Sequence, residues 1–350
     1  MLKTILKNLP NWIKVYGSNG DVIISSRIKV ARNIEGFNFP QKCLLSEKNE
    51  IVRIISEKIE KSNFYKKFNL FGLNILDLSD VERYALVEMH LVSPLFIENP
   101  YGKYLYLSED GTVSIMINEE DHLRIQIIKE GFTLDDIIIN VFEIGDELED
   151  NIEISYSNNL GYLTSCPTNV GTGLRASLLV HLPILTLTGK MNDIIENSTK
   201  FSITIRGTFG EWSETVSSLF QISNSTSLGK SEETIIDSVK KIGREIIKLE
   251  REEREKYVLK NKNFLLDEVR KVKNKLKYSY KISYKDVSET LSILRLASLL
   301  KIIDIPIELI NELLIKTRSN IMKIEFETPL ESIIDNLRAE YIKNILKEYL

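Results

Sequence analysis

The sequence predicts an α+β fold, in which strands and helices alternate up to about residue 230 and helices alone follow. Apolar and polar residues alternate in segments such as 123–127 and 201–206, which is the period of a half-buried strand. From Ser231 onward the apolar residues recur at helical spacing, with breaks at Pro306 and Pro329. A chain of 350 residues is long enough for two domains. We place the boundary near residue 255, which gives domains 1–255 and 256–350.

The composition excludes several classes of protein. The chain is 43% hydrophobic and 27% charged, as in an ordinary globular protein, and its net charge of −4 gives no sign of nucleic-acid or membrane partners. Two cysteines, Cys43 and Cys166, do not suggest a disulfide scaffold. The amino terminus lacks the apolar core of a signal peptide, and the apolar run 178–187 is too short to cross a bilayer. We therefore expect a cytoplasmic protein.

The expected elements follow from local patterns in the chain. Asp110-Gly111 lies between two apolar runs and predicts a hairpin turn. Thr133 precedes two aspartates and predicts a helix start. In order, we expect a helix at 2–15, a strand from 22 into 25–32, a helix at 45–61, a strand at 86–92, strands at 101–107, 112–117 and 123–127, a helix at 133–148, a strand at 201–206 and helices from 231 to the end.

A cysteine turn lies at the centre of the chain. Cys166 is followed by a turn built from Pro167, Asn169 and two glycines, and residues 174–182 then place leucines at helical spacing. On this reading Cys166 lies just before a helix start, where backbone N–H groups and the helix dipole favour a thiolate. Arg175 would lie in the first helical turn, which indicates that an anion binds there.

Residues 161–177, which read Gly-Tyr-Leu-Thr-Ser-Cys-Pro-Thr-Asn-Val-Gly-Thr-Gly-Leu-Arg-Ala-Ser, resemble the reactive-cysteine segment of the phosphagen (guanidino) kinases. The resemblance is closer to the bacterial protein-arginine kinases of that superfamily. It covers roughly residues 20–250, and more weakly 250–350. It implies a catalytic domain with an antiparallel sheet flanked by helices, followed by an all-α C-terminal domain.

The catalytic groups follow from the same resemblance. Residues 118–124, Asn-Glu-Glu-Asp-His-Leu-Arg, match a superfamily motif, although alone they could be an acidic loop tip. The match implies that Glu120 is one catalytic carboxylate, that Glu211 in the loop 207–214 is the second, and that Cys166 aids alignment. A guanidinium stays protonated in water, so a kinase acting on it must orient its planar fork and remove a proton. Two carboxylates can do both.

The resemblance also implies an ATP site, with Mg²⁺ bridging the phosphates and no metal ligand from the protein itself. Lys29 replaces an arginine usual in the family, which keeps the charge and loses the bidentate fork. His90 corresponds to a contact with the nucleotide base. Gly229-Lys230-Ser231 does not form a P-loop, because Asn224 stands where the first glycine belongs. The expected ATP-binding residues are Ser25, Ser26, Arg27, Ile28, Lys29, His90, Arg124, Arg175, Ala176, Ser177, Leu178, Leu179, Arg206, Gly207, Thr208, Phe209, Gly210 and Glu211.

The substrate is expected to be arginine within a protein. Kinases of free arginine or creatine carry a helical domain before the first arginine motif, whereas little more than one short helix precedes Ser25 here. Two alternatives remain: a kinase of a small guanidino compound such as free arginine, and a degenerate regulator that only binds phosphoarginine. The resemblance further implies a stress-response role, an activator or adaptor protein, a Clp-type protease and a homodimer.

A last motif lies near the carboxy terminus. Many protein-arginine kinases carry Arg-Asp-x-x-Arg-Ala there, a phosphoarginine-binding motif. Here it reads Ile334, Asp335, Asn336, Leu337, Arg338, Ala339, so isoleucine replaces the first arginine. The alternative is an ordinary amphipathic helix that buries Ile333, Leu337 and Ile342. With one arginine missing, we expect weak or absent phosphoarginine binding at this segment.

Overall fold

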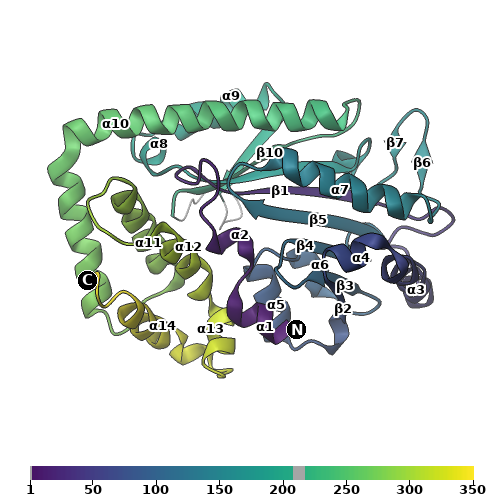
Figure 1. The fold of residues 1–350 in the computed structure, drawn as a ribbon, viewed down its shortest axis with the longest axis horizontal. Coiled ribbons are helices and arrows are strands. Elements are labelled where there is room, and N and C mark those ends of the chain that lie inside the picture. The colour runs from purple at the N-terminus through teal and green to yellow at the C-terminus, as the bar shows by residue number, and fades with distance from the viewer. Residues whose placement is uncertain (1, 208–216) are drawn as a thin grey trace.

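The computed structural model describes residues 2–207 and 217–350. Its centre is an eight-stranded antiparallel sheet in the order β2-β3-β4-β5-β1-β8-β10-β9 (Figure 1). The antiparallel sheet flanked by helices was predicted and is confirmed. The strands are β1 (Ile23–Arg32), β2 (Leu70–Asn74), β3 (Tyr104–Ser108), β4 (Val113–Ile117), β5 (Leu123–Glu130), β8 (Leu174–His181), β9 (Ile203–Gly207) and β10 (Leu219–Asn224), with a separate hairpin of β6 (Tyr156–Ser157) and β7 (Gly161–Tyr162).

Helices cover the sheet and form the C-terminal region. The N-terminal helices are α1 (Leu2–Asn8), α2 (Asn11–Lys14), α3 (Leu45–Lys61), α4 (Asn63–Lys67), α5 (Asp80–Glu88), α6 (Pro94–Glu98), α7 (Leu134–Glu149), α8 (Pro183–Leu187) and α9 (Met191–Thr199). They are followed by α10 (Glu232–Tyr278), α11 (Tyr284–Leu299), α12 (Ile307–Lys316), α13 (Ser319–Glu325) and α14 (Glu331–Ile345). No helix in the described part of the chain is both long and apolar enough to cross a membrane.

The two faces of the sheet are built differently. Along β1, Ile28 and Val30 point into a core formed with α3, α7 and the first half of α10. Because side chains alternate along a strand, Arg27 and Lys29 point to the opposite face. That face is only partly covered, by a second core made of the N-terminal helices, α5, α6 and the C-terminal helices. The uncovered part is where polar side chains can gather.

The helix predicted at 174–182 is wrong, because this segment is strand β8. It pairs with β1 on one side and β10 on the other. Leu174, Ala176 and Leu178 lie in the first core, so the apolar positions follow a period of two as well as helical spacing. A short apolar run satisfies both periods, and pairing on two sides selects the strand.

The strand predicted at 86–92 is also wrong. Ser79 and Glu82 form a capping box that starts α5, which runs to Glu88. A turn follows in which His90 has a φ of 62°. The residues that start this helix, Ser79 and Glu82, lie before segment 86–92, so the pattern within that segment alone does not reveal the helix.

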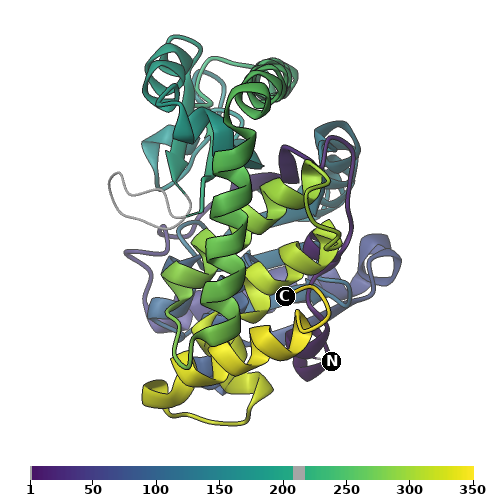
Figure 2. The same ribbon diagram turned by 90° about the vertical axis from the view of Figure 1, so that its left-hand side faces the viewer.

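A single long helix joins the central sheet to the C-terminal helices. Helix α10 contains a non-helical residue at Asn261, and the position near 255 falls within its continuous course. Beyond Asn261 the helix runs beside the C-terminal helices, as Figure 2 shows. Buried Arg295 of α11 donates hydrogen bonds to the Asp21 carbonyl (3.1 Å) and to Asn311 Oδ1 (3.0 Å), which ties the C-terminal helices to the chain just before β1.

Glu250 of α10 is fully buried at this junction, and we expect it to make stability depend on pH. Its carboxylate accepts hydrogen bonds from the backbone N–H groups of Ile184 (3.2 Å) and Leu185 (3.0 Å). Burial raises the pKa of Glu250 from 4.5 to about 7, against the opposing effect of Arg254. The folded chain therefore holds this proton more tightly than the unfolded chain. Its stabilising contribution is complete below pH 4.5 and is lost as the pH rises through about 7.

Relative to a Glu250→Gln variant, the free energy of unfolding of the natural chain should fall by about 3 kcal/mol between these pH values. Urea unfolding of both proteins across this pH range measures the difference. Parallel pH profiles would contradict the assignment.

Candidate functional site

Five cationic side chains lie on the uncovered face of the sheet. They come from four strands: Arg27 and Lys29 from β1, Arg124 from β5, Arg175 from β8 and Arg206 from β9. The strand register places them close together, since Lys29 pairs with Arg175 and Ala31 pairs with Arg124. Arg206 reaches the group across β10, where it pairs with Gln221.

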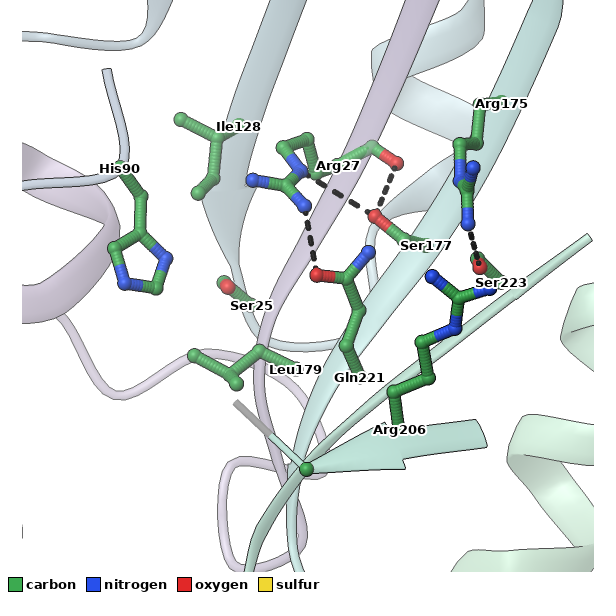
Figure 3. A pocket seen from close by; sticks show the side chains of 11 residues that line it. Ser25, Arg27, His90, Ile128, Arg175, Ser177, Leu179, Arg206, Gln221 and Ser223 are labelled. Carbon is green, nitrogen blue, oxygen red and sulfur yellow. Dashed lines mark hydrogen bonds between the residues drawn. The ribbon is translucent and has the colours of Figure 1, made fainter. Parts of the chain in front are cut away.

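Two adjoining cavities occupy this face, with volumes of about 190 and 340 Å³. They share Arg27, Arg175, Ser177, Arg206 and Gln221. The smaller cavity continues to a less polar end, and the larger one to an acidic end. Figure 3 shows the smaller cavity, which is also lined by Ser25, His90, Ile128, Leu179, Gly207 and Ser223.

Two of the cations shared by the cavities, Arg27 and Arg175, are held by neutral groups. Arg27 Nη2 donates to Gln221 Oε1 at 3.0 Å, and Arg175 Nη2 donates to Ser223 Oγ at 3.0 Å (Figure 3). Burial, together with the neighbouring cations Arg175 and Arg124, lowers the pKa of Arg27 to about 10. Burial and adjacent cations likewise lower the pKa values of Lys29 and Arg175. An anion bound among these side chains would relieve their mutual repulsion.

The acidic end is built around Arg124. Its guanidinium pairs with Glu119 at 2.6 Å and with Glu120 at 3.1 Å. The Glu119 side chain is almost completely buried and also accepts from Ser93 Oγ (2.5 Å) and the Glu120 backbone N–H (2.7 Å). The Glu120 side chain is 27% exposed and lines the larger cavity. The first predicted catalytic acid is thus open to a ligand.

The next two residues of this motif position neighbouring loops. Asp121 Oδ1 accepts from Asn33 Nδ2 and from the backbone N–H of Ser165, both at 2.7 Å. This contact attaches the cysteine turn to the acidic loop. His122 Nδ1 accepts from the Ile34 backbone N–H at 3.1 Å, and burial lowers the pKa of its ring. Sequence reasoning did not find these roles, because the partners lie far away in the chain.

Cys166 lies in the larger cavity with Glu120 and Arg175. Its Sγ is 3.1 Å from Thr168 Oγ1. A single 3₁₀ turn, Pro167–Asn169, follows it, so the predicted stabilisation of a thiolate by an α-helix dipole is wrong. The turn is held tightly against β1. Gly173 has a φ of +66°, and an added Cβ would lie 2.6 Å from the Ala31 carbonyl oxygen.

The structure brings together many of the expected ATP-binding residues but not all of them. Ser26, Ile28, Ala176 and Leu178 do not line either cavity, and the last three point into the core on the other face. Thr208, Phe209, Gly210 and Glu211 lie outside the described residues. The residues found in the cavities are Ser25, Arg27, Lys29, His90, Arg124, Arg175, Ser177, Leu179, Arg206 and Gly207.

Three further positions differ from expectation or were missed. In the sequence Arg27, Lys29 and Arg32 lie at alternate or near-alternate positions, which predicts that they project largely to one side, but Arg32 pairs instead with Glu149 at 2.7 Å. Gln221 and Ser223 line the smaller cavity and hold its arginines, although neither was predicted as a site residue. The available signal in the sequence was that Gln221 and Ser223 are two residues apart, a spacing that in a strand points both side chains to the same face.

The carboxy-terminal motif lies in α14, and its arginine is buried and bonded to other groups of the protein. Arg338 is 1% exposed. It donates to the carbonyls of Thr317 (2.6 Å) and Ile282 (3.0 Å), to Ser319 Oγ (3.1 Å) and to Asp335. Ile334 and Ala339 are buried, Leu337 is half-buried and Asn336 is exposed. The segment is therefore an amphipathic helix, as the alternative predicted. The prediction that Ile333 is buried is wrong, because this side chain is exposed.

The two cysteines should react at different rates. Cys166 lines an open cavity, whereas Cys43 donates to the Asn38 carbonyl at 2.7 Å and burial raises the pKa of its thiol. Because the thiolate is the reactive form, alkylation near neutral pH should label Cys166 first. Peptide mass spectrometry over time measures both rates. Faster labelling of Cys43 would contradict this ranking.

Comparisons with known proteins identify the family. Residues 50–253 match the family described as ATP:guanido phosphotransferase, C-terminal catalytic domain, and residues 262–349 match the protein-arginine kinase McsB C-terminal domain. The chain is 38% identical to a protein-arginine kinase of Halothermothrix orenii over 98% of each chain. It is also 38% identical to that of Bacillus subtilis, over 90% of this chain and 87% of the relative.

Solved structures agree on the fold. A crystal structure of lombricine kinase superposes with a TM-score of 0.58 at 24% identity, over 70% of each chain. The duplicated taurocyamine kinase from Schistosoma mansoni, with bound transition state analog components, gives 0.59 at 26% identity, over 70% of this chain and 35% of that one. Together with the cation-lined cavities and the acidic loop beside them, these matches show that the chain belongs to the protein-arginine kinases of the ATP:guanido phosphotransferase family.

Proposed function

We propose that this protein transfers the γ-phosphoryl group of ATP to arginine side chains of proteins. The proposal rests on one cleft with two different ends. Its cationic surface has no carboxylate partner at Arg27 or Arg175 within the described residues, and its other end carries Glu120 and Cys166. Phosphate oxygens can bind to the cationic surface, and a guanidinium can bind to the acidic end. The phosphoryl group would move between them.

The phosphates of ATP would lie among Arg27, Lys29, Arg124, Arg175 and Arg206. Phosphoryl transfer depends mainly on in-line positioning and on neutralising charge, and a rigid sheet supplies both. The base would lie against His90, Ile128 and Leu179 at the less polar end. No cluster of three or more acidic, histidine or cysteine metal ligands occurs in residues 2–207 and 217–350. We propose that Mg²⁺ is held through the nucleotide phosphates and adds to the charge neutralisation there.

Glu120 would orient the substrate guanidinium and accept its proton. It now pairs with Arg124 at 3.1 Å, while Glu119 holds the same arginine at 2.6 Å. When phosphate binds Arg124, Glu120 can exchange that partner for the incoming guanidinium, since Glu119 keeps Arg124 in place. Cys166 lies in the same cavity and would contact the same fork as a thiolate. Glu211 is proposed as the second carboxylate.

The preference for arginine within proteins rests on the relatives. Those of Halothermothrix orenii and Bacillus subtilis are both described as protein-arginine kinases. The match to a C-terminal domain of that family, starting at residue 262, also supports a division of the chain near residue 255. From the family resemblance we further propose a cytoplasmic stress-response role, with an activating adaptor protein, a homodimeric state and a Clp-type protease that receives the marked proteins.

Replacing the proposed base should abolish transfer while leaving the nucleotide bound. Glu120→Gln removes the proton acceptor and leaves the arginines in place, so turnover should fall about a hundredfold or more. The assay supplies magnesium-ATP with an unfolded basic protein or with free arginine, and measures acid-labile phosphate. Glu153→Gln, an exposed position outside both cavities, is the matched control.

Near-normal activity of the Glu120 variant would refute its role. Transfer by the natural chain to free arginine alone would favour the small-guanidine alternative, and no transfer to either acceptor would favour a regulator without activity.

Phosphoarginine should not bind at the carboxy-terminal motif. Arg338 already has four internal partners, and Ile334 supplies no charge. Calorimetric titration of the full chain should therefore show no more than one phosphoarginine site, the catalytic cleft. An Arg338→Lys variant should give the same titration. A second site in the natural chain, lost in this variant, would show that the motif still binds its ligand.

A further inference from the structure

The segment between Glu88 and Ser93 links the C-terminal helices to the cleft. At its start, the Glu88 carboxylate accepts three hydrogen bonds from the first turn of α13. The donors are the backbone N–H of Asn320 (3.0 Å), Asn320 Nδ2 (2.9 Å) and the backbone N–H of Ile321 (3.0 Å). A carboxylate that receives several N–H groups makes a strong, directional attachment. We call this contact the Glu88 clasp.

The first turn of α13 is itself held firmly. Arg338 of α14 donates to the Thr317 carbonyl and to Ser319 Oγ, the residues on either side of Arg318. Helix α13 also packs against α5, the helix that ends at Glu88. The clasp therefore fixes the end of α5 to a rigid part of the C-terminal region.

Two residues beyond Glu88, His90 lines the smaller cavity. Its backbone has a φ of 62°, which places the ring against the cleft, 5.3 Å from the ring of Trp12. The His90 carbonyl accepts from Gln126 Nε2 of β5 at 2.9 Å. The position of His90 thus depends on attachments to the sheet, to Trp12, whose Nε1 donates to the Met89 carbonyl at 3.3 Å, and, through Glu88, to the C-terminal helices.

We infer that Glu88 is a positioning residue for the nucleotide base. It acts through His90, so that the C-terminal helices complete the base end of the cleft. This inference rests on the proposed binding of ATP in this cleft. The phosphate end depends less on the clasp, because Arg27, Lys29 and Arg175 belong to the sheet itself and only Arg124 is linked to the segment after α5, through Glu119 and Ser93. Loss of the clasp should therefore weaken recognition of the base and spare recognition of the phosphates.

The test compares two ligands that share the phosphates and differ in the base: magnesium-ATP and magnesium tripolyphosphate. In Glu88→Gln one carboxylate oxygen becomes an N–H₂ group that faces the N–H donors of α13, which opens the clasp. Calorimetry on the full chain should show about tenfold weaker binding of ATP, with tripolyphosphate within about twofold of the natural chain. In kinetics, KM for ATP should rise while kcat is retained.

Glu82→Gln is the matched control, because Glu82 lies in the same helix and contacts Ser79 instead of the C-terminal helices. It should bind both ligands normally. Asn320→Asp also breaks the clasp, because it places a second carboxylate next to that of Glu88. This variant should show the same loss of ATP binding, and it replaces Glu88→Gln if that variant does not fold. In a His90→Ala background, Glu88→Gln should have no further effect on ATP.

Equal weakening of both ligands, unchanged ATP binding in the clasp variants, or an additive effect with His90→Ala would overturn the inference. These binding results do not require catalysis. If the natural chain binds ATP but transfers no phosphate, the proposed function fails while the positioning role of Glu88 can still stand.

Discussion

The site depends on the repulsion between cations gathered on one face of a central sheet. Within the described residues, Arg27 and Arg175 are bound by an amide and a hydroxyl, which hold the guanidinium groups in place without neutralising their charge. Such an arrangement lowers stability, and burial makes the cost larger. The opposite face offsets it, because the same strands bury Ile28, Ala176 and Leu178 in an apolar core against α3, α7 and α10. The alternation of the strands thus separates the source of stability from the source of binding.

The rest of the structure orients loops around that face. Asp121 attaches the cysteine turn to the acidic loop, and Ser93 attaches the segment after α5 to Glu119. The C-terminal helices add further attachments through Arg295 and Asn320. These contacts are hydrogen bonds between buried or half-buried groups, which are directional and lose much of their value when displaced. They place the acidic and thiol groups next to the cations within one cleft.

The sequence predicted the fold class, and the five cations that it singled out lie together on one face of the sheet, because strand alternation and contiguous motifs are local signals. It failed where the outcome depended on distant partners. The apolar residues in 174–182 fit both the period of a strand and that of a helix, and pairing with β1 and β10 selects the strand. The sequence pattern does not distinguish Arg32 from Arg27, but in the fold Arg32 pairs with Glu149 and lies over the ring of Tyr162. Gln221 and Ser223 became site residues only through the register of β10.

The two neighbouring acids show how surroundings assign different roles to identical side chains. Glu119 is held by Arg124, by Ser93 and by the next backbone N–H, and its side chain is only 1% exposed. Removing it from this network would leave buried donors unsatisfied, so it cannot serve as a mobile base. In the described part of the chain, the Glu120 side chain pairs with Arg124 alone, and it faces the cavity. Of these two acids, Glu120 is the one that can exchange Arg124 for another cation, as its proposed role requires. The division of labour between adjacent glutamates therefore follows from burial and partner number.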